Sequence, residues 1–115
     1  MDLSDVERTA AGFVVAYLLT AADGGRVHLL AVTPQFGEQA ITIGGVGRHT
    51  AANVEASGRA TLLWSPADAA EYSLIVDGAA SIAAGDDTTV GVATVMITPT
   101  KAILLSRTVS DPNPL

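Results

Sequence analysis

Several strand-like segments of this sequence are apolar on both faces instead of alternating between apolar and polar residues. The clearest is Phe13–Leu19, which contains no charged side chain. A strand of this kind needs two-sided burial, with one face inside a barrel and the other against a helix or a second subunit. The chain has 115 residues, 49% of them hydrophobic, which fits one domain that gains from burying further surface in an oligomer. We therefore expect a mainly β fold that forms a homodimer.

A turn with two glycines separates the first two strand-like segments. Phe13–Thr20 and Arg26–Thr33 are rich in Val, Leu and Tyr, and Asp23-Gly24-Gly25 between them can adopt the positive φ angles of a tight turn. Pro34 ends the second segment. Ala40–Gly44 then follows as a third strand, so we predict a three-stranded meander.

Strand signals return in the second half of the chain. They cover Ala60–Trp64, Tyr72–Ile82 and Val90–Leu105. Within the second of these segments, Asp77-Gly78 interrupts an apolar run. We predict a β-bulge there, and a ligand contact is the alternative interpretation. Trp64 and Tyr72 are expected to fill the core or a subunit contact, and stacking on a cofactor is the alternative. The sequence therefore predicts six to seven mostly antiparallel strands.

Two short helices accompany these strands. Ser4-Asp5-Val6-Glu7 has the spacing of a capping box, which predicts an N-terminal helix within residues 1–11 that covers one end of the barrel. A second helix is predicted from about Thr50 to Ser57, with Gly58 as its left-handed C-cap. Residues 107–115 contain two prolines and are predicted to be a flexible tail. Residues 1–115 are thus expected to form a single domain.

The stretch from Gly44 to Asn53 reads GGVGRHTAAN and joins a strand to the second helix. Backbone N–H groups at a helix N-terminus lack intrahelical partners and lie at the positive end of the helix dipole. A nearby Arg48 completes a site for a phosphate, so the segment suggests a phosphorylated ligand. An ordinary strand-to-helix connection capped by Thr50 would have the same local sequence.

Composition narrows the classes of function. The formal net charge of −6 with only six Lys and Arg residues argues against nucleic acid as a partner. The chain has no cysteine, and two histidines without a third or a carboxylate cluster do not suggest a metal site. The acidic, polar N-terminus lacks the features of a secretion signal, and no apolar run approaches the length of a membrane span. We expect a cytoplasmic protein that does not bind membranes.

The order of these elements resembles the pyridoxamine 5′-phosphate oxidase-like split β-barrels, which bind flavins or deazaflavins. Three motifs carry the resemblance, and it extends over residues 12–105: Asp23–His28 in the first hairpin, Gly47–Asn53 at the helix, and Tyr72–Ala80 in a later strand. The resemblance implies a split β-barrel with one or two short helices. It also implies a homodimer whose cofactor lies in a groove between the subunits.

The resemblance further implies positions for the cofactor phosphate. Arg48, His49 and Thr50 would lie near it, and Asn53 would steady the corner by side-chain hydrogen bonding. Many members of the family have a lysine at the position of Thr50. A hydroxyl supplies no charge there, so flavin affinity is expected to be lower or a different ligand to be preferred.

The ring of the cofactor has its own expected contacts. By resemblance, Ala31, Val32 and Thr33 at the end of the second strand would run beside the isoalloxazine ring. The chain is shorter than true pyridoxamine phosphate oxidases at its C-terminal end, where they hold the pyridoxal substrate. That specific activity is therefore not expected.

These inferences lead to three hypotheses about function. The first is an oxidoreductase that binds FMN, or alternatively F420, and transfers hydride to a small, hydrophobic acceptor. The ring would carry that chemistry, so the lack of a recognisable catalytic triad does not oppose it. The second is a non-catalytic dimer that binds or stores a cofactor, haem or another small ligand. The third is a role limited to structural dimerisation.

Overall fold

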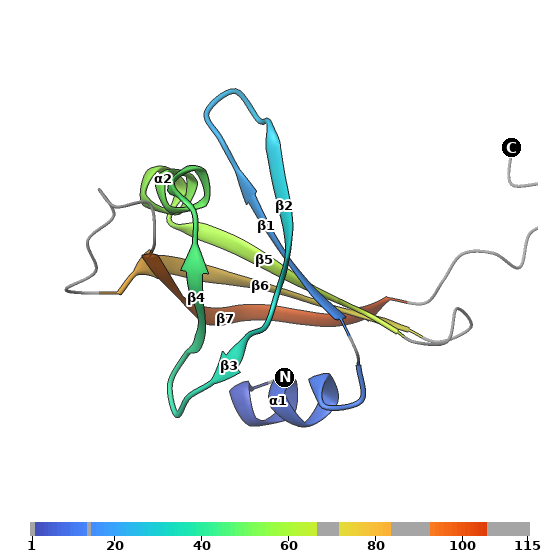
Figure 1. Ribbon diagram of the computed structural model, residues 1–115. Coiled ribbons are helices and arrows are strands. Elements are labelled where there is room, and N and C mark those ends of the chain that lie inside the picture. Colours follow the sequence, from blue (N-terminus) through green and yellow to red (C-terminus); the bar gives the residue numbers. More distant parts are fainter. Residues whose placement is uncertain (1, 14, 67–71, 84–92, 106–115) are drawn as a thin grey trace, which may run out of the picture.

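A curled antiparallel sheet dominates the computed structural model, which describes residues 2–13, 15–66, 72–83 and 93–105 (Figure 1). The described residues form two helices and seven strands: α1 (Leu3–Ala10), β1 (Val15–Ala21), β2 (Val27–Val32), β3 (Gln35–Phe36), β4 (Ile41–Val46), α2 (Arg48–Ser57), β5 (Arg59–Ser65), β6 (Ser73–Ile82) and β7 (Ala93–Leu105). The strand order in the sheet is β2-β1-β5-β6-β7-β4-β3. This arrangement confirms the predicted mainly β fold of six to seven antiparallel strands with two short helices, and the curled sheet forms a half-barrel. The predicted tail at 107–115 lies outside the described residues.

The first hairpin has the predicted geometry. β1 and β2 pair in antiparallel register, with Thr20 opposite His28. Gly24 and Gly25 have φ angles of 87° and 88°, a region that side chains disfavour. The turn between the two strands is therefore confirmed, and its tip projects beyond the rest of the sheet in Figure 1.

The predicted meander is wrong. β4 pairs with β7 and with β3, and Ile41 lies opposite Ile97. Hairpin loops usually have about two to five residues, whereas the segment between β2 and β4 runs from 33 to 40 and contains Pro34. The third long strand therefore crosses to the far side of the sheet, and β3 forms within this connection.

The two helices begin at different residues from those predicted. Asp2 caps α1: its carboxylate accepts from the Asp5 N–H over 2.9 Å, and the Asp5 carboxylate completes the capping box. The cap at Ser4 was therefore misplaced by two residues. α2 begins at Arg48 with Gly47 as its N-cap, so Thr50 is not a cap. The predicted C-cap at Gly58 is confirmed by its left-handed φ of 68°.

The inner face of the sheet holds the core. Leu18, Leu62 and Val76 face one another across β1, β5 and β6 and are fully buried. Trp64 is also buried and stacks on Phe36, with 6.1 Å between the ring centroids. Tyr72, in contrast, is 54% exposed and does not belong to this core.

The outer face of the sheet is apolar but less covered. Tyr17, Leu63, Ile75 and Ile103 form one row across β1, β5, β6 and β7. The first three are half-buried, and Ile103 is 39% exposed. The strands are thus apolar on both sides as the sequence indicates, but in the single chain only the inner side is fully buried.

The helix α2 covers the inner face. It lies against β1, β6 and β7, and its buried residues are Thr50, Ala51 and Val54. α1 lies at the opposite end of the half-barrel in Figure 1. Neither helix of the described part combines the length and apolar character that crossing a bilayer would require.

The predicted bulge at Asp77-Gly78 is confirmed by a shift of register between β6 and β7. Gly78 is needed there because the strands approach closely. A Cβ at this position would lie 2.5 Å from Cγ2 of Ile97 and 2.7 Å from the backbone oxygen of Thr98.

We therefore expect Gly78→Ala to lower the free energy of unfolding by about 1–3 kcal/mol, the usual cost of overpacking. The measurement is urea denaturation of the variant and the parent protein. Gly12→Ala is the matched control, because its Cβ would meet only the Thr9 carbonyl oxygen at 3.7 Å. Equal losses in the two variants would contradict a steric role for Gly78.

Candidate functional site

The corner between β4 and α2 is built from glycines. The β4–β7 register shifts between Ile43 and Val46, and Gly45 within this stretch has a φ of 73°. Gly47 follows as the N-cap and supplies no side-chain hydrogen bond to the helix. The first backbone bond of α2 runs from the Ala51 N–H to the Gly47 carbonyl oxygen, over 3.1 Å. Three N–H groups at the positive end of α2 are therefore left for water or a ligand.

Space and charge at this corner both suit an anion. A Cβ at Gly45 or at Gly47 would meet no heavy atom within 4 Å, so a ligand can approach the backbone. The first turn of α2 has no acidic residue, and Arg48 is exposed. Within the described part of the chain, the one ion pair joins Arg8 to Asp5, so no described carboxylate neutralises Arg48. The arrangement has the donors and the charge that bind phosphate groups.

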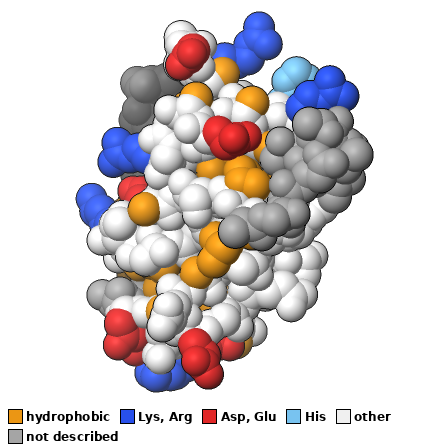
Figure 2. Space-filling model, turned by 90° about the vertical axis from the view of Figure 1, so that its left-hand side faces the viewer, with side chains coloured by type: hydrophobic (Ala, Val, Ile, Leu, Met, Phe, Trp, Pro, Cys, Tyr) orange, Lys and Arg blue, Asp and Glu red, His pale blue; other side chains and the backbone are white. Residues whose placement is uncertain are grey.

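A histidine from β2 joins the same corner. The rings of His28 and His49 lie 6.3 Å apart between centroids, with an angle of 44° between their planes. From the sequence alone, His28 has the pattern of an ordinary strand residue. Its proximity to α2 cannot be predicted, because it depends on how the helix crosses the sheet. The space-filling view in Figure 2 shows a histidine beside a basic side chain at the upper edge of one face, with a broken stripe of apolar side chains below.

The side chain of Asn53 joins α2 to the first strand. Its Nδ2 donates to Oγ1 of Thr20 over 3.1 Å, and Thr20 is only 4% exposed. The bond anchors α2 to the end of β1. Thr20 lies opposite His28 in the β1–β2 register. The hydrogen bond from Asn53 to Thr20 therefore also holds α2 near the start of β2. A contact between Asn53 and a cofactor stays a prediction.

The side chain of Thr50 takes a different direction. It is 1% exposed, because Thr50 belongs to the face of α2 that packs on the sheet. Its hydroxyl therefore does not lie at the surface of the corner. What Thr50 retains for a ligand is its backbone N–H in the first turn of the helix.

The predicted ring contacts lie further along β2. Ala31 and Val32 pair with Tyr17 and Ala16, and Thr33 follows the end of the strand. At about 3.3 Å per residue, Ala31 is roughly 10 Å along the strand from His28. The three residues therefore do not belong to the corner, and their contact with a ring stays a prediction.

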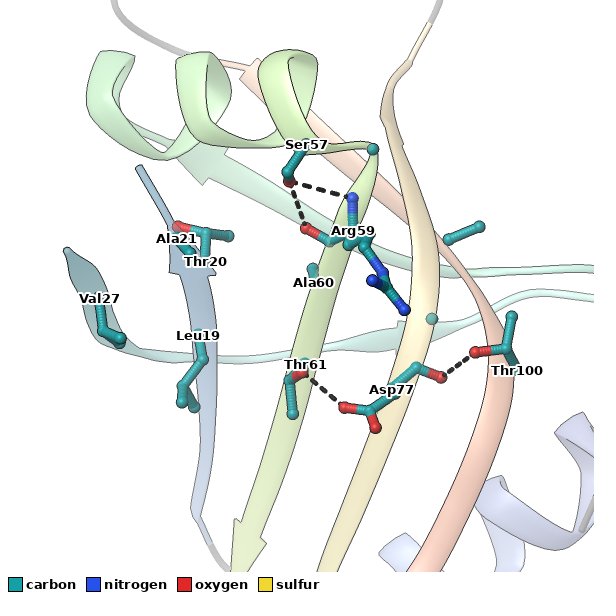
Figure 3. Close-up of a pocket in the computed structure, with 13 residues that line it drawn as sticks. Leu19, Thr20, Ala21, Val27, Ser57, Arg59, Ala60, Thr61, Asp77 and Thr100 are labelled. Atoms are coloured by element: carbon teal, nitrogen blue, oxygen red, sulfur yellow. Dashed lines mark hydrogen bonds between the residues drawn. The ribbon is translucent and has the colours of Figure 1, made fainter. Parts of the chain in front are cut away.

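A groove that the sequence did not indicate lies on the outer face of the sheet. Its volume is about 460 Å³, and Figure 3 shows its polar side chains on β5, β6 and β7. The carboxylate of Asp77 accepts from Oγ1 of Thr61 over 2.6 Å, and the Asp77 carbonyl accepts from Oγ1 of Thr100 over 3.2 Å. Thr20 also lines the groove, which places the groove next to the Asn53 anchor.

The described residues contain no group of three His, Asp or Glu side chains placed to hold a metal ion. His28 and His49 form a pair without a carboxylate beside them in this set. The chemistry at the corner is therefore best described by its anion-binding donors.

Comparison with known proteins gives two kinds of similarity. Uncharacterized proteins of Mycobacterium bovis and Mycobacterium tuberculosis are each 39% identical to this sequence, in an alignment that covers 87% of this chain and 78% of each relative. No family model matches the sequence.

Solved structures share the architecture at much lower identity. A putative pyridoxamine 5′-phosphate oxidase from Listeria innocua has a TM-score of 0.69 at 14% identity and covers 91% of this chain and 98% of its own. A haem storage protein from Vibrio cholerae has a TM-score of 0.68 at 12% identity, with coverages of 90% and 95%. A pyridoxamine 5′-phosphate oxidase-related, FMN-binding protein from Nostoc punctiforme has a TM-score of 0.63 at 10% identity, with coverages of 84% and 78%. At these identities the similarity is one of fold.

The Asn53 anchor leads to a prediction. Asn53→Ala leaves the buried Thr20 hydroxyl without this donor, so we expect the free energy of unfolding to fall by about 1–3 kcal/mol. Thr20→Val removes the acceptor, and the double variant should lose less than the sum of the two single losses. Urea denaturation of all four proteins provides the cycle. Strictly additive losses would mean that the bond does not hold α2 to β1.

Proposed function

The chain belongs to the family of the two mycobacterial proteins and has the fold of the pyridoxamine 5′-phosphate oxidase-like split barrels, and from this premise we propose that it binds FMN. The observation that carries the proposal is the uncapped N-terminus of α2, lined by glycine and next to the exposed Arg48. The FMN-binding neighbour from Nostoc punctiforme supports the same class of ligand. The deazaflavin F420 is the alternative cofactor.

Each part of the corner has a role toward the phosphate. The N–H groups of Arg48, His49 and Thr50 would bind its oxygens, and the guanidinium of Arg48 would add a charge-assisted bond. Asn53 would hold the corner in place through Thr20. Ala31, Val32 and Thr33 would run beside the flavin ring.

We assign the protein a hydride-transfer reaction with a small, hydrophobic acceptor. When bound, the flavin ring supplies the redox chemistry. The chain would orient the ring with β2 and exclude water from it. No side chain is required as a general acid or base in this scheme.

The crevice for the cofactor would form between two subunits. The outer row of Tyr17, Leu63, Ile75 and Ile103 is the surface we assign to the contact, because it is apolar and only partly covered within one chain. Burial of apolar surface is the main favourable contribution to most protein–protein association. A homodimer would thus satisfy the two-sided apolar character of the strands.

A second candidate function is non-catalytic binding or storage of haem. The proximity of His28 and His49 favours it, because imidazole is a common axial ligand of haem iron. Thr50 adds no charge for a flavin phosphate. The haem storage protein from Vibrio cholerae has the same fold.

The phosphate contact is tested with two ligands that differ only in that group. Arg48→Ala should weaken FMN binding by about 10- to 150-fold, because a charge-assisted bond contributes about 1.5–3 kcal/mol. Riboflavin has no phosphate, so its affinity should not change. Both are titrated against the protein by flavin fluorescence. Arg8→Ala on α1 is the matched control and should alter neither ligand.

The same titrations also distinguish this proposal from its alternatives. Equal losses of FMN and riboflavin affinity would show that Arg48 does not bind the phosphate. Parallel titrations of F420 and haem, followed by visible absorption, separate the alternative ligands. Saturable FMN binding without reduction by any donor tested would favour a binding protein over an oxidoreductase.

The subunit contact gives a separate prediction. Ile75→Lys places a charge in the apolar row, and we expect it to convert a dimer to a monomer in light scattering after size-exclusion chromatography. Gln39→Lys adds the same charge in an exposed loop and should leave the dimer intact. A parent protein that is monomeric at high concentration would refute the proposed crevice.

A further inference from the structure

We propose that the groove on the outer face of the sheet binds a small carboxylic acid that carries an amino or hydroxyl group on its α-carbon and a short apolar side chain. Arg59 would bind the carboxylate, and Asp77 would accept a hydrogen bond from the α-substituent. This goes beyond the proposed cofactor, which is assigned to the other end of α2.

The groove exists because residues with small or no side chains surround Arg59. Ala79 lies opposite Arg59 in the β5–β6 register, and Ala21 contributes another short side chain. Gly58 and Gly78, which also line the groove, have no side chains. The resulting volume of about 460 Å³ lies within the range of small-molecule sites, about 300–1,000 Å³.

Arg59 is the receptor for a carboxylate. Its side chain is exposed and extends over β5 and β6 in Figure 3, on the side of the sheet that carries Asp77. Among the described residues its guanidinium forms no ion pair, with Asp77 or any other carboxylate. The guanidinium fork matches a carboxylate with two parallel hydrogen bonds. A ligand carboxylate would supply the missing partner.

Asp77 would make the site selective for ligands that carry a single negative group. Thr61 donates to one of its oxygens, which orients the carboxylate, and an ionised carboxylate has further acceptor positions. A second anionic group on a ligand would be repelled here, whereas an ammonium or hydroxyl group would donate to it. An α-amino or α-hydroxy acid carries a donor on the carbon next to its carboxylate, so one molecule offers a partner to each of these two side chains.

The remaining wall of the groove is apolar. Leu19 and Val27 line its side toward the first hairpin, and Val27 is 60% exposed. Branched aliphatic atoms of a ligand would cover this surface. The groove lies next to the apolar outer row, since Leu19 and Thr61 are each two residues from a member of that row.

The experiment uses three probes that differ in one group each: L-leucine, 4-methylpentanoate and 3-methylbutylamine. Binding to the full chain without cofactor is followed by ligand-observed NMR. We expect saturable binding that is strongest for leucine, weaker for 4-methylpentanoate and weakest for the amine. No saturable binding of either carboxylate would overturn the proposal.

Two variants test the assigned roles. Arg59→Gln should reduce the affinity for both carboxylates by tenfold or more, whereas Arg8→Gln should change neither. Asp77→Asn should abolish the preference for leucine over 4-methylpentanoate. Unchanged carboxylate affinity in Arg59→Gln would refute the site. FMN affinity of Arg59→Gln is measured in parallel and should equal that of the parent, which separates this site from the cofactor corner.

Discussion

The path of α2 across the inner face of the sheet is the constraint on which the rest of the structure depends. β4 lies beside β7, whereas β5 lies beside β1, so the chain must cross the half-barrel between them. A helix with three buried residues makes this crossing and closes the core. The bond from Asn53 to Thr20 fixes its position against β1. Both candidate sites lie at the ends of this helix.

The two ends of α2 differ in chemistry. At the N-terminus, Gly47 leaves N–H groups uncapped, and Arg48 and His49 reach the surface. At the C-terminus, Gly58 closes the helix and the chain enters β5 with Arg59 over the groove. The first end suits a phosphate, and the second suits a single carboxylate beside an acceptor. One short helix would thus separate the two proposed sites, one for a phosphate and one for a single carboxylate.

Local chemistry made part of this structure predictable. Gly58 was found because the left-handed C-cap of a helix favours glycine. The bulge was found because Asp77-Gly78 interrupts an apolar strand, which is typical of a bulge or a close approach of the backbone. The glycine-rich turn before α2 was predicted from residue types in one short segment, and its role as a phosphate site stays a prediction. Three features were not predicted: the position of β4 beside β7, the proximity of His28 to His49, and the groove at Arg59. Each depends on segments that are brought together from distant parts of the sequence. Sequence periodicity gives the faces of a strand but not its neighbours.

The central claim is that the first turn of α2 binds the phosphate of a cofactor. Backbone 15N–1H NMR of the full chain tests it directly, by following the amides of Arg48, His49 and Thr50 during titration with FMN and then with riboflavin. The account predicts that these three amide signals shift with FMN and stay near their original positions with riboflavin. Saturable FMN binding that leaves all three signals unmoved would contradict it.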